Sequence, residues 1–356
     1  MFTYPKRYDV IVVGAGHAGC EAALASARMG GQTLLLTSNI NTIALMSCNP
    51  AIGGVGKGQL VKEIDALGGE MGRAIDATGI QFRQLNTRKG PAVRSSRAQA
   101  DRKAYNQYFR QVLEDQPDLD LKEGMVEWIL TENGRAVGVR TNFKEKYLGK
   151  TVVLCPGTFL NGLIHIGLQS SPAGRMGDFP SIGLSKSLQR LGLRLGRFKT
   201  GTPPRIDRRT VDFSQLTEQK GDQTPLPFSF WTEKIKRKQV SCSLTRTTTL
   251  TNEIIRKNLN RSPLYSGKIK SRGVRYCPSI EDKVVKFPDR ESHQVFLEPE
   301  GLKSNLIYPN GLSTSLPIEV QYQFLQTVPG LKQAKIVRPG YGIEHDYVDP
   351  NQLEPS

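Results

Sequence analysis

Two of the five cysteines in this 356-residue chain lie in segments where a thiol could react. Cys48 and Cys277 each lie close to a proline, in stretches typical of loops. Cys20 and Cys155 fall in an expected helix and at an expected strand end, and we interpret both as small buried hydrophobic residues. The odd number and wide spacing of the cysteines indicate neither a zinc site nor a disulfide framework. A loop thiol is accessible to ligands, and its thiolate is a nucleophile.

Cys48 belongs to a glycine-rich segment, residues 41–58, which reads NTIALMSCNPAIGGVGKG. Its end invites comparison with a nucleoside-triphosphate loop, but the pattern GxxxxGK[ST] fails because Ala51 takes the first glycine position and Gly58 the last position. One interpretation is a loop, stiffened by Pro50, whose backbone N–H groups and thiol face a bound cofactor. The other is a buried cysteine in an ordinary loop. The residue types leave both interpretations open.

A cofactor of this kind would be positioned by the segment Tyr8–Gly31, which reads as strand, glycine turn and helix. Val10–Val13 is an unbroken apolar run, typical of a strand in a covered parallel sheet. Gly14, Gly16 and Gly19 follow in the spacing GxGxxG, which permits a tight turn, close approach to a pyrophosphate and close packing of helix on strand. Because a helix N-terminus attracts anions, the segment predicts a dinucleotide-binding site.

The second strand, expected at Thr33–Leu36, bears on which dinucleotide binds. About twenty residues after the turn an acid usually holds the ribose hydroxyls. Here the strand ends in Thr37-Ser38-Asn39, without a carboxylate. The sequence therefore favours FAD over NAD at this first site.

The charge balance indicates a polyanionic partner. Lys and Arg number 49 against 33 Asp and Glu, a net charge of +16. Such an excess favours nucleic acid or an anionic surface. The longest apolar runs are far short of a membrane span, and residues 1–7 lead directly into the first strand, so we expect neither a signal peptide nor a membrane anchor. Nucleic acid is the expected partner of a cytoplasmic or organelle-matrix protein.

A basic stretch, residues 81–103, concentrates seven cations against the single acid Asp101. We expect Pro91 to begin a helix, which would place Arg94 and Arg97 one turn apart. The two interpretations are a phosphate-binding edge and a solvated helix face, and the weak compensation of charge favours the first. The cations are Arg83, Arg88, Lys89, Arg94, Arg97, Arg102 and Lys103.

Further elements are expected along an α/β chain. Residues 118–130 and 135–141 alternate as strands around the hairpin turn Asn133-Gly134. Residues 151–157 read as a buried strand that returns to the main sheet. A glycine- and proline-rich loop leads to a helix that Ser181 could cap, with Leu184, Leu188 and Leu191 on its inner face.

The composition changes near residues 194–209, which are basic and broken by prolines. We place a boundary there: a Rossmann-like FAD-binding domain at 1–198, an inserted mixed α/β second domain at 199–338, and a return to the first domain at 339–356. The second domain carries basic tracts at 234–238 and 268–275. Trp231, Tyr265 and Tyr276 lie among these charges and could stack on unpaired bases or belong to the core.

Eight motifs in order carry a resemblance to one family. They are GAGHAG, SCNPAIGGVGKG, LNTRKGPAVRSSRAQAD, GRFKTGTPPRID, RYCPSIEDK, FLEPEG, YPNGLSTSLP and RPGYGIEHD. From the first strand to about Pro350 the chain resembles the tRNA uridine 5-carboxymethylaminomethyl modification enzymes, the MnmG (GidA) family. Eight motifs are far more specific than a dinucleotide fingerprint.

The resemblance implies an FAD enzyme that works with the GTPase MnmE on the wobble uridine of tRNA. Family members attach an aminomethyl or carboxymethylaminomethyl group at uracil carbon 5, with methylenetetrahydrofolate as one-carbon donor and NADH as a reductant of the flavin. They form homodimers and, with MnmE, a heterotetramer. Carbon 5 is a poor nucleophile until a thiolate adds at carbon 6. Cys48 and Cys277 match the family's two functional cysteines, and the sequence does not apportion their roles.

The resemblance also implies binding residues. The FAD contacts of the family fall on Gly14, Ala15, Gly16, His17, Ala18, Gly19, Val126 and Ser181. Its nicotinamide-associated segment falls on Gly273, Val274, Arg275, Tyr276, Cys277, Pro278, Ser279, Ile280, Glu281, Asp282, Lys283, Val284, Val285, Lys286 and Phe287. We assign tRNA contacts to Arg94, Arg97, Arg275 and Lys283, against the alternative of ordinary surface charge.

The chain departs from the family pattern at its end. Members continue through a glycine-rich segment that completes the FAD site and a C-terminal helical domain, and we expect both to be absent from a chain that stops at Ser356. Two alternatives therefore stand beside the active enzyme. One is a noncatalytic FAD- or tRNA-binding module. The other is the related folate- and FAD-dependent tRNA uracil methyltransferase, against which the SCNPAIGGVGKG and RYCPSIEDK motifs argue.

Overall fold

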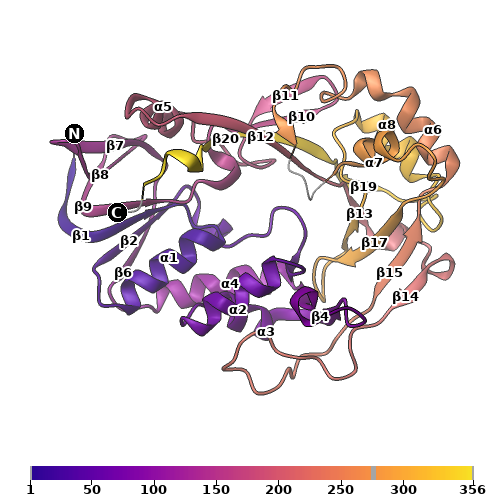
Figure 1. The fold of residues 1–356 in the computed structure, drawn as a ribbon, viewed down its shortest axis with the longest axis horizontal. Helices are drawn as coiled ribbons and strands as arrows, with labels where there is room; N and C mark the ends of the chain where they lie inside the picture. Colours follow the sequence, from indigo (N-terminus) through magenta and orange to yellow (C-terminus); the bar gives the residue numbers. More distant parts are fainter. Residues whose placement is uncertain (1, 274–277, 355–356) are drawn as a thin grey trace.

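The N-terminal part of the chain is built on a six-stranded sheet. The computed structural model describes residues 2–273 and 278–354. The strand order is β6-β2-β1-β9-β8-β7, and the four strands from β6 to β9 run parallel. Figure 1 shows this sheet beside the N-terminus, at the left of the view. Its strands are β1 (Thr3–Val13), β2 (Thr33–Thr37), β6 (Leu119–Glu123), β7 (Val126–Glu132), β8 (Arg135–Thr141) and β9 (Lys146–Leu154).

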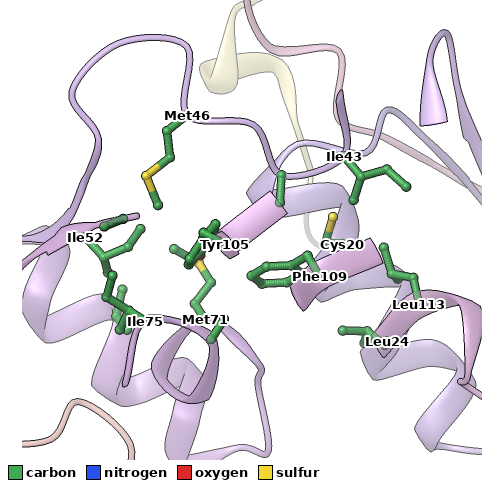
Figure 2. Close-up of a cluster of buried hydrophobic side chains, with 14 of the residues drawn as sticks. Cys20, Leu24, Ile43, Met46, Ile52, Met71, Ile75, Tyr105, Phe109 and Leu113 are labelled. Atoms are coloured by element: carbon green, nitrogen blue, oxygen red, sulfur yellow. The ribbon is translucent and has the colours of Figure 1, made fainter. Parts of the chain in front are cut away.

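Four helices pack together below this sheet in Figure 1: α1 (His17–Arg28), α2 (Lys57–Ala66), α3 (Met71–Thr78) and α4 (Arg102–Glu114). They enclose a hydrophobic core in which Cys20, Leu24, Tyr105 and Phe109 are buried, as Figure 2 shows. A small antiparallel sheet adjoins the helices, in the order β3 (Ala51–Gly53), β5 (Ser95–Ala100), β4 (Gly79–Leu85). The core therefore fixes α1, and with it the glycine turn, against the sheet.

A second sheet joins the N-terminal part to the rest of the molecule. Its order is β11-β10-β20-β12-β16. β12 runs outward and β20 returns antiparallel to it, with Lys199 opposite Glu344. Helix α5 (Ile182–Arg190) precedes β12. The strands are β10 (Leu163–Ile166), β11 (Gln169–Pro172), β12 (Leu195–Thr202), β16 (Arg272–Gly273) and β20 (Tyr341–Val348).

The region between β12 and β20 has its own sheet and core, at the right of Figure 1. The sheet order is β14-β15-β17-β18-β13-β19. Helices α6 (Thr249–Lys257), α7 (Ile280–Lys286) and α8 (Ile318–Leu325) cover it and bury side chains such as Ile280 and Phe324. The strands are β13 (Arg205–Asp207), β14 (Thr217–Gln219), β15 (Cys242–Arg246), β17 (Gln294–Pro299), β18 (Leu306–Asn310) and β19 (Ile336–Arg338). The boundaries at residues 198 and 338 stay a prediction.

The helix expected from Pro91 is wrong. Pro91 opens only a short 3₁₀ turn, Pro91–Val93, and the chain then extends into β5. Helix α4 begins at Arg102, where the Asp101 side chain accepts a hydrogen bond from Ala104 N. Pairing of β5 with both β3 and β4 outweighs the local helix signal, because it satisfies the backbone of the segment through tertiary contacts.

Three further expectations need correction. The strand at residues 151–157 does return to the sheet as β9, but Thr151 and Val153 are exposed, since only the face carrying Val152 and Leu154 packs on a core. Ser181 occupies the N-cap position of α5 without capping it, because its hydroxyl donates to Val126 O at 3.0 Å. Leu191, expected on the inner face of that helix, is exposed.

The hairpin at Asn133-Gly134 is confirmed. β7 and β8 pair antiparallel, and Asn133 and Gly134 have φ values of 50° and 77°. Positive φ at both central residues is what a two-residue turn of this kind requires. In the described part of the chain, no helix has both the length and the apolar character needed to cross a membrane.

Candidate functional site

A cavity opens at the carboxyl ends of β1, β2 and β9. In parallel sheets this edge is where nucleotide ligands bind. The walls come from the glycine turn after β1, the end of β2, the residues before and at the start of β7, and the loop after β9. The lining includes Gly14, Ala15, Gly16, Thr37, Ser38, Ser47, Val126, Cys155, Arg175 and Ser181.

The three glycines of the turn meet three different surroundings. A Cβ built on Gly14, whose φ is +98°, would lie 2.4 Å from Cys155 O, and one on Gly19 would lie 1.7 Å from Gly14 O. Gly16 has nothing within 4 Å of its Cβ position, and it lines the cavity. Gly14 and Gly19 therefore serve the protein's own packing, whereas Gly16 leaves room for a ligand over the N-terminus of α1.

The cavity suits a dinucleotide whose ribose hydroxyls are not held by a carboxylate side chain. Thr37 and Ser38 line the wall at the end of β2, where a carboxylate would hold the ribose hydroxyls. Val126 and Ser181 also line the cavity, and the Ser181 hydroxyl donates a hydrogen bond to the backbone oxygen of Val126. Of the eight residues predicted to contact FAD, Gly14, Ala15, Gly16, Val126 and Ser181 lie in this lining.

His17, Ala18 and Gly19 lie beside the cavity in α1 and are not among its lining residues. His17 turns its ring toward Tyr105, with the ring centres 5.6 Å apart, and its buried Nε2 has no hydrogen-bond partner among the described atoms. Burial, and secondarily the positive charge of Lys57, lowers the pKa of His17 to about 3. This histidine is therefore neutral at physiological pH.

Arg175 is the charged side chain among the described residues of the cavity lining. It is buried, its Nε lies 2.7 Å from Asp178 Oδ2, and its Nη1 donates to Ser47 Oγ at 2.9 Å. The guanidinium also lies over the Phe159 ring. A cation in this position ties the loop that carries Cys48 to the wall of the cavity.

Cys48 follows Ser47 and is not among the residues described as lining the cavity. Its side chain is half-buried between β12 and β18. Its Sγ is 3.5 Å from Gly201 O, on β12, and 3.0 Å from Tyr308 Oη, on β18. The Tyr308 hydroxyl is buried, which raises its pKa well above the ordinary value, with the Cys48 thiol as the next contribution. Cys48 thus has polar partners, unlike a cysteine packed in a plain hydrophobic loop.

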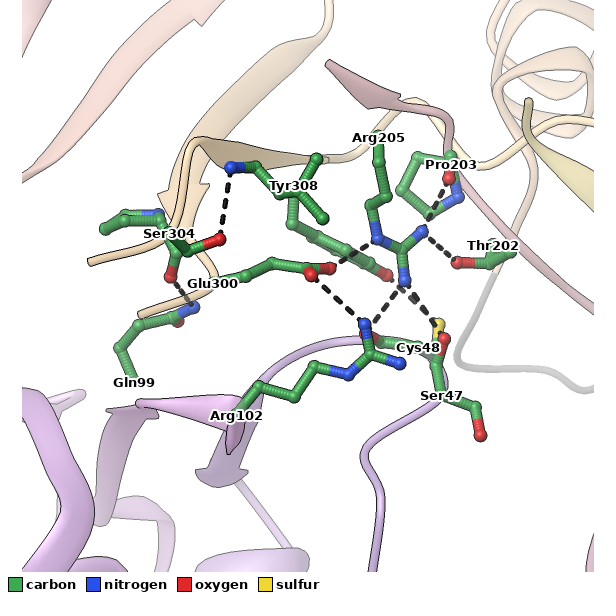
Figure 3. Close-up of polar contacts among 12 residues, drawn as sticks. Ser47, Cys48, Gln99, Arg102, Thr202, Pro203, Arg205, Glu300, Ser304 and Tyr308 are labelled. Carbon is green, nitrogen blue, oxygen red and sulfur yellow. Dashed lines mark hydrogen bonds and ion pairs between the residues drawn. The ribbon is translucent and has the colours of Figure 1, made fainter. Parts of the chain in front are cut away.

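Arg205 holds the same loop from β13. Its guanidinium donates to Ser47 O at 3.0 Å and to Cys48 O at 3.4 Å, as Figure 3 shows. Its Nε is 2.6 Å from Glu300 Oε1, and its Nη1 donates to Thr202 Oγ1 and Pro203 O. The guanidinium carbon also lies 4.5 Å from the centre of the Tyr308 ring.

Glu300 is shared by two cations. Arg102 Nη1 lies 3.0 Å from Glu300 Oε2, so the carboxylate joins α4 to Arg205 (Figure 3). Burial raises the pKa of Glu300, but the charges of Arg205 and Arg102 outweigh it and hold the pKa below the ordinary value. The ionised carboxylate compensates the buried guanidinium of Arg205 and the partly buried one of Arg102, whose burial without a counter-charge would be costly.

The other cysteines lie in less reactive surroundings. Cys20 is fully buried, and Cys155 is half-buried in the cavity lining, so its expected full burial is wrong because the cavity exposes one side. Burial raises the pKa of both thiols, and raises that of Cys242 to about 12. Cys277 lies outside the described residues.

The predicted tRNA-contact residues have different environments. Arg94 is exposed and donates from Nε to Lys89 O, at the end of the 3₁₀ turn. Arg97 lies on β5 and forms a 2.7 Å ion pair with the buried Glu298. Lys283 lies on α7 and donates to Gly311 O at 2.9 Å. Arg275 lies outside the described residues. A phosphate at Arg97 would have to compete with Glu298.

The predicted nicotinamide segment is only partly described. Val274, Arg275, Tyr276 and Cys277 lie outside the described residues. Ser279 caps α7, with its Oγ accepting from Asp282 N at 3.2 Å. Ile280 and Val284 belong to the second core, and Glu281 is buried and accepts from Ser315 N at 3.0 Å. In the part of this segment that the structure describes, Ile280 and Val284 therefore face the second core, whereas Val285 and Phe287 are exposed.

Sequence reasoning missed the residues that hold the Cys48 loop. Arg205, Glu300 and Tyr308 lie in three of the motifs that carry the resemblance, TPPRID, LEPEG and YPNG, but no role followed from the motifs alone. Arg205 lies on β13, Tyr308 on β18 and Glu300 directly after β17, and only folding brings the three together beside the Cys48 loop.

A second, basic hollow lies on α3, α4 and the segment after Leu226. Its lining includes Arg73, Trp231, Lys234, Lys236 and Arg237. Trp231 is 67% exposed, so it belongs to the surface rather than to a core. Arg73 lies over its ring at 5.4 Å. Tyr265, in contrast, is half-buried and donates to Asp282, and Tyr276 lies outside the described residues.

The parallel sheet, the glycine turn and the cavity define an α/β protein of the dinucleotide-binding class, with a large insertion between β12 and β20. The family described as "Glucose inhibited division protein A" (GidA) matches residues 9–356, and the chain belongs to this family. The Rossmann-like fold class with an inserted mixed α/β region is thereby confirmed, as is the recognition of the family from its motifs.

Curated relatives and solved structures agree with this membership. The tRNA uridine 5-carboxymethylaminomethyl modification enzymes MnmG of Syntrophotalea carbinolica and Geobacter sulfurreducens are each 61% identical over 356 residues, all of this chain. The chain spans 58% and 57% of the lengths of these two proteins. GidA of Aquifex aeolicus in its form I crystal matches with a TM-score of 0.93 and 56% identity, over 98% of this chain and 59% of that one.

Proposed function

We propose that the chain binds FAD in the cavity beside the glycine turn and takes part, with the GTPase MnmE, in modification of carbon 5 of the wobble uridine in tRNA. The observation that carries the first half is the open space at Gly16 over the N-terminus of α1. Membership of the GidA family and the 61% identity to MnmG enzymes support the second half.

The residues that would hold FAD follow from the cavity. The backbone of Gly14, Ala15 and Gly16 would face the pyrophosphate, where the free N–H groups at the start of α1 attract an anion. Thr37 and Ser38 would meet the ribose, and Val126 the adenine side. When bound, the flavin would supply hydride transfer at the transferred carbon.

The cysteines would supply the covalent step. One thiolate forms a bond to uracil carbon 6, and the electron pair of the carbon 5–carbon 6 double bond moves to carbon 5. Carbon 5 then bonds to the one-carbon unit, while a bond between that unit and a nitrogen of its folate donor breaks and leaves its electron pair on the nitrogen. Loss of the proton on carbon 5 and departure of the thiolate from carbon 6 restore the double bond. Cys48 and Cys277 are the candidates, and Cys48 is the one whose described surroundings, between Tyr308 and Gly201, suit a sulfur that gains and loses charge.

The finer parts of the proposal come from the family resemblance. They are methylenetetrahydrofolate as one-carbon donor, NADH as reductant near residues 273–287, a homodimer, and a heterotetramer with MnmE. The basic surface supports tRNA as the substrate: the net charge is +16, and Arg94 is exposed.

The first test is retention of flavin. The purified chain is incubated with FAD, freed of excess by gel filtration and examined by absorbance. We expect flavin bands to elute with the wild-type protein and not with Gly16→Ala, whose Cβ the protein itself accommodates. Absence of flavin from the wild-type protein would contradict FAD binding by this chain.

The second test is nucleoside analysis. The chain is expressed with MnmE in a strain that lacks the modifying enzyme, and tRNA nucleosides are measured by liquid chromatography and mass spectrometry. We expect the carbon 5 derivative with wild-type protein and its loss with Cys48→Ser, with flavin still bound. Flavin binding without the nucleoside would favour a noncatalytic module, and a methylated uridine would favour the folate-dependent methyltransferase.

A further inference from the structure

We propose that Tyr308 is a positioning residue for Cys48, one that aims the sulfur and donates a hydrogen bond to its thiolate. The inference deepens the proposed function, since it concerns the thiol that would add to uracil. It rests on the contacts of four groups: the Cys48 sulfur, the Tyr308 hydroxyl, the Gly201 carbonyl and the Arg205 guanidinium.

The geometry assigns the direction of the hydrogen bonds. Cys48 has a single thiol proton, and its Sγ has the Gly201 carbonyl, an acceptor only, at 3.5 Å. The other neighbour of the sulfur is Tyr308 Oη at 3.0 Å. If the thiol donates to the carbonyl, the tyrosine must donate to the sulfur. Figure 3 shows Cys48 and Tyr308 together with the Arg205 network.

Deprotonation changes the two contacts in opposite ways. A thiolate cannot donate, so its contact with the Gly201 carbonyl oxygen becomes repulsive. The Tyr308 hydroxyl meets a full negative charge, and a hydrogen bond to an ionised acceptor is roughly twice as strong as a neutral one. Tyr308 therefore stabilises the thiolate more than the thiol, whereas Gly201 favours the thiol.

Arg205 strengthens the donor. Its guanidinium lies 4.5 Å from the Tyr308 ring centre, where a cation is attracted to the ring and withdraws electron density from the hydroxyl. Burial keeps the hydroxyl protonated, because it raises the pKa of Tyr308 well above the ordinary value. The side chain is 3% exposed, so water competes poorly for this donor.

Other charges around the thiol come from several elements. Arg205 contacts the carbonyls of Ser47 and Cys48, and Arg175 contacts Ser47 Oγ. Lys57 of α2 interacts with Cys48 through its charge, and Glu298 with Tyr308. All these groups remain when the tyrosine hydroxyl alone is removed, so Tyr308→Phe isolates the hydrogen bond.

The test measures alkylation of Cys48 in the 356-residue chain. Native protein is treated with iodoacetamide at several pH values between about 6 and 9, a span around the ordinary titration range of a thiol, and the rate at each cysteine is read from its peptide by mass spectrometry. With Tyr308→Phe we expect the Cys48 rate at neutral pH to fall about tenfold, and to approach the wild-type rate at the alkaline end. Replacement of Tyr308 alone by 3-fluorotyrosine, a stronger donor, should raise the neutral-pH rate.

The controls separate thiolate stabilisation from access. Tyr322→Phe removes a hydroxyl that donates to Ile336 O at 3.3 Å and should leave the Cys48 rate unchanged. Cys155 provides an internal standard in every sample. The proposal would be overturned if Tyr308→Phe left the alkylation rate of Cys48 unchanged or altered it by the same factor at every pH. It would also be overturned if the 3-fluorotyrosine protein reacted at Cys48 no faster than wild type at neutral pH. The fluorotyrosine protein also decides the matter if Tyr308→Phe does not fold.

Failure of the proposed function would look different. Alkylation requires neither flavin nor tRNA, so an absent modified nucleoside with the expected alkylation rates refutes the activity and leaves the Tyr308 assignment in place. The reverse result, modified nucleoside with no effect of Tyr308 on the thiol, refutes only the assignment.

Discussion

One residue type serves three purposes in the glycine turn. Gly14 and Gly19 let the backbones of the turn, the helix and the loop after β9 approach one another, and Gly16 faces the open cavity. The spacing GxGxxG predicts all three positions. Since each has a different neighbour, equal substitutions should have unequal effects.

Gly16→Ala and Gly19→Ala form a matched pair. Gly19→Ala places a Cβ 1.7 Å from Gly14 O, and we expect it to lower the free energy of unfolding by about 3 kcal/mol. Gly16→Ala should leave the free energy of unfolding nearly unchanged while removing flavin binding. Denaturant titration and flavin absorbance measure the two effects. Equal destabilisation by both changes would contradict the assignment of Gly16 to the ligand.

His17 adds a pH dependence at the residue scale. The pKa of His17 is about 3 in the folded chain and has the ordinary value of 6.5 in the unfolded chain. Between these two pH values the unfolded chain therefore binds a proton at His17 and the folded chain does not. His17 thus destabilises the fold by about 1.4 kcal/mol for each pH unit below about 6. The stability of wild type should fall more steeply from pH 6 to pH 5 than that of His17→Asn, measured by thermal unfolding. Parallel curves would show that His17 is protonated in the folded state.

At the scale of elements, the Cys48 loop depends on strands far away in sequence. It has little regular structure of its own between the 3₁₀ turn Ile40–Thr42 and β3. Arg175, Arg205 and Tyr308 hold it instead, from the loop after β11, from β13 and from β18. The loop and the insertion are therefore one structural unit, although the chain separates them widely.

Arg205 is the residue whose loss this unit should tolerate least. Arg205→Met leaves Glu300 with Arg102 as its remaining cation and removes the buried guanidinium that donates to the carbonyls of Ser47 and Pro203, and we expect a loss of about 3–5 kcal/mol in the free energy of unfolding. Arg209→Met, which removes an exposed arginine nearby, should change it little. Denaturant titration compares the two, and similar losses would refute the buried network as the cause.

For the whole molecule, charge should govern association with tRNA. A net charge of +16 makes binding to a polyanion release counterions. The exposed Trp231, with Lys234 and Lys236 beside it in the basic hollow, could add stacking on an unpaired base.

Affinity for tRNA should therefore fall steeply with salt. We expect a linear decrease of log affinity with log salt concentration, measured by filter binding between about 50 and 200 mM. Lys234→Ala with Lys236→Ala should make the slope shallower, and Trp231→Ala should weaken binding at every salt concentration without changing the slope. The control is Lys186→Ala with Lys257→Ala, which removes two exposed lysines on α5 and α6, outside the lining of the hollow. A flat salt response would exclude phosphate contacts as the main source of affinity.

The local sequence by itself determined the glycine turn, the strand Val10–Val13, the hairpin at Asn133-Gly134 and, through the motifs, the family. These features depend on φ, side-chain size and patterns within a few residues, so they are readable along the chain. Two local predictions were wrong, a helix that begins at Pro91 and a helix cap by Ser181. The segment after Pro91 instead forms β5, which pairs with two strands, and the Ser181 hydroxyl donates to Val126 O. Both outcomes depend on contacts that are distant in sequence.

Only the tertiary structure decided what surrounds Cys48. Loop residues can be recognised from a proline and a thiol, but their partners Tyr308, Gly201 and Arg205 lie more than 150 residues away. Which of many possible partners reaches a sulfur depends on the sheet order and the register of β12, β13 and β18, and these are set by packing of the whole molecule. The sequence determined that a thiol was available, and folding decided which groups control it.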